Sequence, residues 1–314
     1  MQDQGVKDST LNAIGNTPVV RLTRMLPPRA ANVLVKLEYY NPTGSYKDRM
    51  ALAMISEAEA RGALRPGMTV IEYTGGSTGS SLAFVCAVKG YKFQVVSSDA
   101  FAPEKLATMR AFGADVQIEA SRGGQITPDL LPRMMERVRT LAAQVNGYRT
   151  DQLNNADSIK GYAGIGRELA NQANGHIDVF CGGVGTAGML VGVANVLKPL
   201  GTRIVALEPA TSTPIAGGAS GTHHVEGIGI GFKPPLLDPG SYDEVRSVDE
   251  QLARETARRM AREEGIFGGT SSGLNVAAAI QLATELGPGR TVATVCVDTG
   301  LKYLAGDLYD FGSQ

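Results

Sequence analysis

A lysine follows a turn-forming stretch close to the start of a helical pattern. The turn is Asn-Pro-Thr-Gly-Ser-Tyr-Lys-Asp-Arg, residues 41–49, and apolar residues recur at helical spacing from Ser45 to Arg61. This spacing predicts a helix over 45–61 with Ser45 as N-cap. The positive end of the helix dipole disfavours an ammonium there, and a lysine that attacks an aldehyde must be uncharged. Lys47 is therefore a candidate nucleophile; the alternative is a solvated surface lysine.

A glycine-rich loop follows the strand expected over 69–74. Its sequence is Thr-Gly-Gly-Ser-Thr-Gly, Thr74 to Gly79, and a helix is expected from Ser80 to Lys89. Main-chain N–H groups at a helix N-terminus, together with hydroxyls, bind small anions such as carboxylates. A tight turn with ordinary capping is the alternative interpretation.

A second glycine-rich loop, residues 182–188, lies between a strand expected over 177–181 and a helix expected over 188–198. Gly183, Gly185 and Gly188 match the pattern G-x-G-x-x-G, and Glu208 ends the next expected strand. This arrangement is typical of dinucleotide-binding proteins, in which the acid contacts the ribose. The same loop geometry binds any phosphate group. NAD and another phosphorylated cofactor both remain open at this point.

A third loop, Gly-Gly-Thr-Ser-Ser-Gly over residues 268–273, is expected to connect a helix over 249–264 with one over 274–285. Ser271 and Ser272 could simply cap the second helix. His176, His223 and His224 have no ligand-spaced partner in the sequence, so no metal site is predicted.

The elements around these loops alternate between short β-branched runs and helical patterns, which predicts an α/β fold of mostly parallel sheets flanked by helices. A chain of 314 residues is long enough for two hydrophobic cores. We place the boundary near Gly147. The segment between Glu208 and Asp249 is rich in Gly and Pro and is expected to be a long functional loop.

Composition excludes several classes of protein. The net charge is −1, which gives no indication of nucleic-acid binding. The three cysteines form no C-x-x-C pair and lie in or beside apolar runs, as expected for free thiols in a reducing compartment. The first residues have no signal-peptide pattern, and no apolar run reaches the length of a membrane span. The sequence therefore predicts a cytoplasmic protein that does not bind membranes.

Taken in order, the motifs resemble the cysteine synthase/cystathionine β-synthase family, the tryptophan-synthase-β-like enzymes that use pyridoxal 5'-phosphate. The resemblance runs nearly end to end and rests on these segments: 14–18 (Ile-Gly-Asn-Thr-Pro), 41–49, Gln152, 183–188, 225–231 (Val-Glu-Gly-Ile-Gly-Ile-Gly), 264–266 (Glu-Gly-Ile), 271–273 and 298–300 (Asp-Thr-Gly). It implies a two-domain fold-type-II enzyme. Residues 1–147 would contain the smaller substrate-carboxylate domain, about 45–147, with the first 40 or so residues packing on the other domain. Residues 148–314 would form the larger domain that binds the cofactor's phosphate.

The resemblance also implies roles for individual residues. Lys47 would carry the cofactor as a Schiff base and move the proton at the substrate's Cα. Ser271 would face the pyridine nitrogen, with Ser272 as the alternative. The phosphate loop would comprise Gly183, Gly185, Thr186, Ala187 and Gly188. The substrate α-carboxylate would be held by Thr74, Gly75, Gly76, Ser77, Thr78 and Gln152, with Ser77 also reaching the cofactor. Gly227 and Gly229 would lie near the reacting side of the substrate.

The sequence departs from the family pattern in three places, two in segments expected to hold the substrate and one in the phosphate loop. The common sequence of the first loop is T-S-G-N-T-G, so that Gly75 and Ser77 here replace a serine and an asparagine. The shorter Ser77 reaches one of the two contacts made by that asparagine, or leaves room for a bulkier substrate. Met189 stands where the phosphate loop usually has threonine, and residues 154–157 differ from the usual proline and asparagine.

The resemblance implies β-replacement on an activated L-serine of the O-acyl type with a sulfur nucleophile, in a homodimer whose ligand is a small amino acid. A neutral serine at the pyridine nitrogen leaves the ring a weaker electron sink than an aspartate would, which favours loss of a β-substituent over transamination. The alternatives are a β-elimination lyase, a dehydratase or a racemase with the same cofactor, a nicotinamide dehydrogenase built on the second loop and Glu208, and a homologue without turnover.

Overall fold

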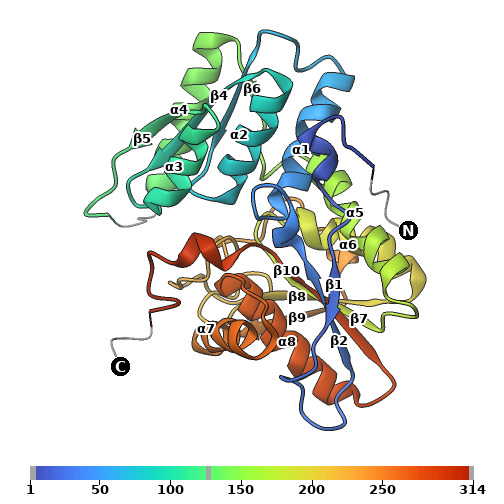
Figure 1. Ribbon diagram of the computed structural model, residues 1–314. Helices are drawn as coiled ribbons and strands as arrows, with labels where there is room; N and C mark the ends of the chain where they lie inside the picture. The colour runs from blue at the N-terminus through green and yellow to red at the C-terminus, as the bar shows by residue number, and fades with distance from the viewer. Residues whose placement is uncertain (1–4, 125–128, 311–314) are drawn as a thin grey trace. The chain divides into compact units, whose positions relative to one another are not determined.

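The computed structural model describes residues 5–124 and 129–310. The chain divides into two compact units, one formed by residues up to Gly15 with Asn41–Gly161, the other by Asn16–Tyr40 with the residues from Tyr162 onward. The observed division at 161/162 lies 14 residues beyond the boundary expected near Gly147. Figure 1 shows the elements of each unit.

The first unit contains a parallel sheet of four strands in the order β5-β4-β3-β6. The strands are β3 (Thr69–Tyr73), β4 (Lys92–Ser98), β5 (Asp115–Glu119) and β6 (Tyr148–Arg149). Strand β6 was not predicted because its two residues carry no alternation. All five residues of β3 are buried, as expected for a strand with helices on both faces.

Four α-helices of the described residues belong wholly to this unit: α1 (Lys47–Ala60), α2 (Ser77–Lys89), α3 (Pro103–Ala111) and α4 (Leu130–Val145). The prediction that Ser45 caps α1 was wrong. Tyr46 occupies the cap position without a side-chain hydrogen bond, and Lys47 is the first helical residue. Helix α2 begins at Ser77, three residues before the predicted start. The segment Thr74–Gly79, predicted to be a loop, therefore includes the first turn of α2.

The second unit contains a six-stranded sheet in the order β1-β2-β10-β7-β8-β9. Its strands are β1 (Val19–Arg21), β2 (Asn32–Leu37), β7 (Val179–Gly183), β8 (Arg203–Pro209), β9 (Glu244–Val248) and β10 (Thr291–Cys296). Strand β1 is antiparallel to β2, and the other pairs are parallel. Strand β9 lies inside the segment expected to be a long loop, which corrects that prediction.

Three α-helices of the described residues lie wholly in the second unit: α6 (Gly188–Leu197), α7 (Glu250–Arg259) and α8 (Thr270–Leu286). Helix α5 (Asp157–Gln172) crosses the division between the units. The helical pattern predicted over 249–264 becomes α7 followed by a π-helical turn, Met260–Glu264. Helix α8 begins at Thr270 and not at Leu274, so Ser271 and Ser272 lie in its first turn. The 3₁₀-helices are Thr10–Ala13, Glu38–Tyr40, Lys198–Leu200, Pro239–Ser241 and Gly300–Tyr303.

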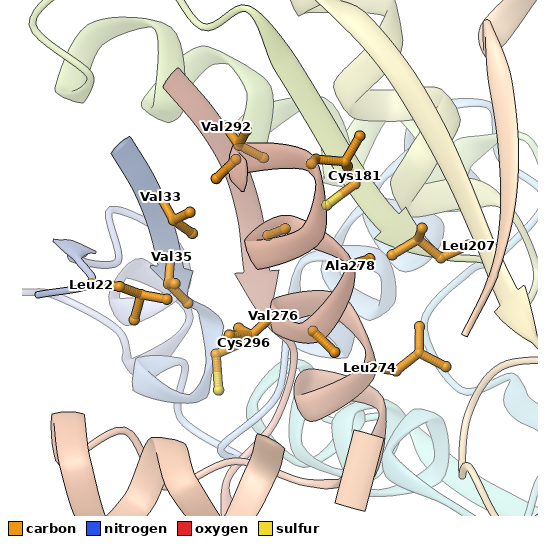
Figure 2. Packing of buried hydrophobic residues seen from close by; sticks show 14 of the residues in the cluster. Leu22, Val33, Val35, Cys181, Leu207, Leu274, Val276, Ala278, Val292 and Cys296 are labelled. Atoms are coloured by element: carbon orange, nitrogen blue, oxygen red, sulfur yellow. The ribbon is translucent and has the colours of Figure 1, made fainter. Parts of the chain in front are cut away.

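Helix α8 supplies much of the core of the second unit. Its buried residues, including Leu274, Val276 and Ala278, belong to one apolar cluster with residues of β2, β7, β8 and β10, part of which Figure 2 shows. Two neighbouring glycines at the end of β7, Gly182 and Gly183, face opposite sides of the sheet. A Cβ at Gly182 would meet Met189 of α6, whereas a Cβ at Gly183 would meet Ile228 and Asn275 of α8. The end of β7 is therefore enclosed on both faces.

None of the helices among residues 5–124 and 129–310 is long and apolar enough to cross a membrane. Within the same residues, no group of three or more His, Cys, Asp or Glu side chains is arranged to hold a metal ion. The three cysteines are buried free thiols.

Candidate active site

Lys47 opens α1 and follows a turn that side chains hold in place. The Asp48 carboxylate accepts hydrogen bonds from the Thr43 backbone N–H at 2.8 Å and from the Thr43 hydroxyl at 2.6 Å. The Lys47 N–H donates to Ser45 Oγ at 3.3 Å. The Lys47 side chain is only 8% exposed, and its Nζ lies 5.1 Å from the centre of the Tyr46 ring. Lys47 is thus a buried amine on a fixed backbone, not a solvated surface lysine.

The turn before Lys47 contacts helix α2, which follows the Thr74–Gly79 loop. The hydroxyls of Thr43 and Ser81 are 3.2 Å apart. Ser81 lies one helical turn beyond Ser77, so both occupy the same face of α2. The structure of the first unit therefore brings the N-terminal ends of α1 and α2 together.

The Thr74–Gly79 loop turns directly from β3 into α2. The Gly76 N–H donates to Thr74 Oγ1 at 3.2 Å, and no side chain caps α2. An uncapped helix N-terminus leaves N–H groups for an anion. The Thr78 hydroxyl donates to Gln152 Oε1 at 2.8 Å, so two residues predicted to hold the carboxylate are in direct contact.

Gln152 is held from three directions. Its Nε2 donates to the Tyr73 carbonyl at 3.4 Å, its Oε1 accepts from Thr78, and its backbone N–H donates to Glu72 Oε2 at 3.1 Å. Asp151, immediately before it, has a φ of +49°, a left-handed conformation that is uncommon for a residue other than glycine. The position of Gln152 is therefore specified by backbone groups as well as by its side chain.

Glu72 lies beneath this loop and was not singled out from the sequence. It is 1% exposed and accepts hydrogen bonds from the Tyr73 N–H at 2.9 Å and the Thr150 hydroxyl at 2.6 Å, in addition to the Gln152 N–H. Burial raises the pKa of Glu72 to about 7, because desolvation outweighs these three hydrogen bonds. No Lys, Arg or His in the described residues forms an ion pair with it.

An aromatic ring covers the first glycine of the same loop. A Cβ placed on Gly75 would lie 2.1 Å from Cγ of Phe101. Phe101 itself packs against the cluster that includes Tyr73 and Leu130. The ring occupies the space that a side chain at residue 75 would need, so glycine is required there as long as Phe101 stays in place.

The second glycine-rich loop forms a cradle of main-chain amides at the N-terminus of α6. In the part of the chain that the structure describes, the N–H groups of residues 185–188 have no hydrogen-bond acceptor. Gly185, Ala187 and Gly188 are nevertheless buried. Ala187 has a φ of +71°, which turns the chain into the helix. Buried amides without partners at a helix N-terminus suit a phosphate dianion, and the residues present fit that group.

The Gly227–Gly229 loop packs directly on this cradle. The Gly229 N–H donates to the Val184 carbonyl at 3.0 Å, and a Cβ on Gly185 would lie 2.3 Å from the Gly227 carbonyl oxygen. His223 Nε2 is 2.8 Å from the Gly229 carbonyl oxygen, and the Val225 N–H donates to His223 Nδ1 at 3.2 Å. The structure thus brings together two loops that lie about 40 residues apart in the sequence.

Ser271 and Ser272 have different surroundings. Ser272 Oγ accepts from the Val297 N–H at 3.0 Å and is fully buried. Within residues 5–124 and 129–310 no group hydrogen-bonds to the Ser271 hydroxyl, although that residue is only 3% exposed. Asn275, one turn further along α8, accepts from the Gly183 N–H through Oδ1 at 2.8 Å. Residues four apart share a helix face, so Ser271 lies on the side of α8 that faces the phosphate loop.

The interpretation of Glu208 as a ribose-binding acid does not hold. Its carboxylate is buried and accepts hydrogen bonds from the N–H groups of Ile215 at 2.9 Å and Ala216 at 3.1 Å. Both oxygens are engaged in fixing the chain after β8. The glycine-rich loop therefore lacks the free acidic residue that a dinucleotide-binding site requires for the ribose.

Several residues that support the two loops were not identified from the sequence. They are Glu72, Phe101, Thr150, His223 and Asn275. Glu72 and Thr150 are 78 residues apart, and Gly183 and Asn275 are 92 apart, so no local pattern links the partners.

Comparisons with known proteins identify the family of the chain. The family model described as "Pyridoxal-phosphate dependent enzyme" matches residues 10–298. A cysteine synthase of Staphylococcus aureus is 41% identical over 312 residues, covering 97% of each chain. An O-ureido-L-serine synthase of Streptomyces lavendulae is 37% identical, covering 96% of this chain and 93% of that protein. The crystal structure of a cysteine synthase from Entamoeba histolytica is similar with a TM-score of 0.92 and 32% identity, covering 100% of this chain and 94% of that one.

Proposed function

The chain belongs to the family of pyridoxal-phosphate dependent enzymes, and from this premise we propose that it catalyses β-replacement on an O-acyl-L-serine with a sulfur nucleophile. The cofactor is pyridoxal 5'-phosphate. The observation that carries the proposal is the cradle of partnerless amides at residues 185–188 of the described chain, where Gly185, Ala187 and Gly188 are buried. It accommodates a phosphate without a cation, and the similarity to cysteine synthases extends over 97% of the chain.

The cofactor, when bound, supplies an electron sink for the negative charge that develops at the substrate's Cα. In our proposal the amides of residues 185–188, with the Thr186 hydroxyl, hold its phosphate. Gly183 contributes to this cofactor-binding loop through its position at the end of β7, because its N–H already donates to Asn275 Oδ1. Lys47 is the covalent carrier and takes the Cα proton on Nζ. Burial of Lys47 supports this role, because an amine that is shielded from water is easier to keep uncharged.

The pyridine nitrogen is assigned to Ser271 and not to Ser272. The Ser272 hydroxyl already accepts the Val297 N–H, whereas Ser271 lies on the face of α8 that is turned toward the phosphate loop. A hydroxyl is neutral, so it does not hold the ring in its cationic form as a carboxylate would. This favours departure of the β-substituent over transamination.

The substrate's α-carboxylate is assigned to residues 74–78 and Gln152. Support comes from the uncapped N-terminus of α2 and from the Thr78–Gln152 hydrogen bond of 2.8 Å. One hydrogen on Gln152 Nε2 donates to Tyr73, and the other is available for a carboxylate oxygen. Ser77 contributes a hydroxyl toward the cofactor, and Gly227 and Gly229 border the reacting side of the substrate.

The experiment is a product assay with the purified, cofactor-loaded protein. O-acetyl-L-serine and sulfide should give cysteine, and O-acetyl-L-serine alone should give little pyruvate. Lys47→Ala should lose turnover and the visible absorbance of the bound cofactor, whereas the exposed Lys92→Ala should keep both. Pyruvate as the main product with sulfide present would identify a β-lyase instead, and a wild type that never takes up the cofactor would overturn the assignment.

We further propose that the enzyme works in the cytoplasm as a homodimer. Three buried free thiols support a reducing compartment. Light scattering on the eluting protein measures the mass directly, and a monomer mass of 33.0 kDa at working concentration would contradict the dimer.

A further inference from the structure

Glu72 is a buried carboxylate without a cation among the described residues, and such a group is costly to keep in a folded protein. It accepts three hydrogen bonds from fixed donors: the Tyr73 N–H on Oε1, and the Thr150 hydroxyl and Gln152 N–H on Oε2. Backbone N–H groups can only donate. A carboxylate is the one side chain of this length that accepts at both ends, so the chemistry of the donors requires it.

The donors connect Glu72 to the substrate end of the site. Glu72 precedes Tyr73 at the end of β3, and the Tyr73 carbonyl accepts from Gln152 Nε2. The Gln152 backbone is held by Glu72 and its side chain by Thr78. Asp151 keeps its left-handed φ of +49° immediately before the Glu72-bound N–H. Without this acceptor the turn would be free to relax, and Gln152 would move with it.

We propose that Glu72 is a positioning residue that acts through Gln152 and thereby sets the affinity for the substrate's α-carboxylate. This inference rests on the proposed function, because it takes Gln152 as a carboxylate ligand. Glu72 touches neither substrate nor cofactor. It fixes the distance between the Gln152 amide and the Thr78 end of α2.

The test is Glu72→Gln in the cofactor-loaded enzyme. The new amide would turn an NH₂ group toward one of the two backbone donors, the Tyr73 N–H or the Gln152 N–H, and that donor would lose its acceptor. Either loss loosens the segment that holds Gln152, because the Tyr73 carbonyl accepts from Gln152 Nε2. We expect binding of the unreactive probe L-alanine, followed by the cofactor's visible absorbance, to weaken about tenfold. The Michaelis constant for O-acetyl-L-serine should rise by a similar factor, with the turnover number changed less than about twofold.

A double-variant comparison separates positioning from general destabilisation. Gln152→Ala should weaken L-alanine binding, and Glu72→Gln combined with Gln152→Ala should be no weaker than Gln152→Ala alone. Glu57→Gln is the matched control, because Glu57 pairs with Lys160 on the exposed surface.

A second measurement needs no ligand. Hydrogen exchange of the Gln152 backbone amide should speed up about tenfold or more in Glu72→Gln, while that of the Gly183 amide should not change.

The outcomes are distinguishable. A wild-type protein that takes up the cofactor but does not bind L-alanine would overturn the proposed function and this inference together. A wild type that binds L-alanine, with Glu72→Gln binding equally well, would overturn the inference alone. The inference would also be overturned if the loss of L-alanine affinity in the double variant equalled the product of the losses in the two single variants. Glu72 would then act independently of Gln152.

Discussion

The two glycine-rich loops both present amides at a helix N-terminus, yet they are supported in different ways. The loop before α6 is backed by main chain and by one amide side chain: Asn275 accepts from Gly183, and the Gly227–Gly229 loop packs on Gly185. The loop before α2 is supported by a chain of side chains that includes Glu72, Thr78 and Gln152.

This difference matches what each loop is proposed to bind. A phosphate is the same in every turnover, and a cradle made of backbone does not change with pH or with most substitutions. A substrate carboxylate must be held beside side chains of varying size. A loop supported by titratable and replaceable side chains can be adjusted by single substitutions, and Gly75 and Ser77 are such departures from the family pattern.

The largest effect is expected from Gly185→Ala. A Cβ there would lie 2.3 Å from the Gly227 carbonyl oxygen, and backbone cannot move aside cheaply. We expect an overpacking cost of about 3 kcal/mol, which corresponds to cofactor binding weakened ~100-fold. Titration of the cofactor-free protein with pyridoxal 5'-phosphate measures this directly.

Thr186→Ala is the control for that prediction, since it removes a hydroxyl but leaves the amide. Its loss should stay within about tenfold, the value of one ordinary hydrogen bond. A Thr186→Ala protein that binds the cofactor less well than Gly185→Ala would contradict the view that backbone dominates this loop.

Much of the arrangement could be predicted from the sequence because it is local. A strand, a glycine-rich loop and a helix follow one another within a few residues, so the loops at residues 74–79 and 183–188 and the helix that Lys47 opens were found, with starts shifted by two or three residues. The α/β class and the family resemblance were confirmed by the comparisons.

Two kinds of feature could not be predicted: hydrogen bonds between residues far apart in the sequence, and very short strands. The acceptors that fix the loops, Glu72 and Asn275, bond to residues 78 to 92 positions away. Strand β1 has three residues and β6 two, too few for an alternating pattern. The proposed assignment of the pyridine nitrogen to Ser271 depends on the Val297 N–H, which lies 25 residues from Ser272 and meets its hydroxyl only in the folded protein.

A second prediction concerns pH and sharpens the contrast between the loops. Burial raises the pKa of Glu72 from 4.5 to about 7, so the folded state holds its proton more tightly than the unfolded chain. The stabilisation from this proton is complete below pH 4.5 and is lost as the pH rises through 7. The loss amounts to about 3 kcal/mol, because each tenfold difference in proton affinity between the two states is worth ~1.4 kcal/mol.

Denaturant unfolding of wild type and Glu72→Gln at a series of pH values checks this prediction. The free energy of unfolding of the wild type should fall relative to that of the variant between pH 4.5 and about 7, and the difference should be constant outside this range. Glu57→Gln keeps Glu72, so its free energy of unfolding should fall relative to that of Glu72→Gln over the same pH range. A constant difference for Glu72→Gln throughout would mean that the buried carboxylate titrates normally.

The smallest effect is expected from restoring the serine that the family usually carries at residue 75. In Gly75→Ser the new Cβ would lie 2.1 Å from the Phe101 ring, and the ring must leave its place against the Tyr73 cluster. Overpacking of this kind costs ~1–2 kcal/mol, so the Michaelis constant for O-acetyl-L-serine should rise about tenfold while cofactor binding is unchanged. Adding Phe101→Ala should return the constant toward the wild-type value, because the collision is gone. If Gly75→Ser with Phe101→Ala is as impaired as Gly75→Ser alone, the glycine is needed for its backbone and not for the space that Phe101 fills. The substrate loop would then be as rigidly specified as the phosphate loop.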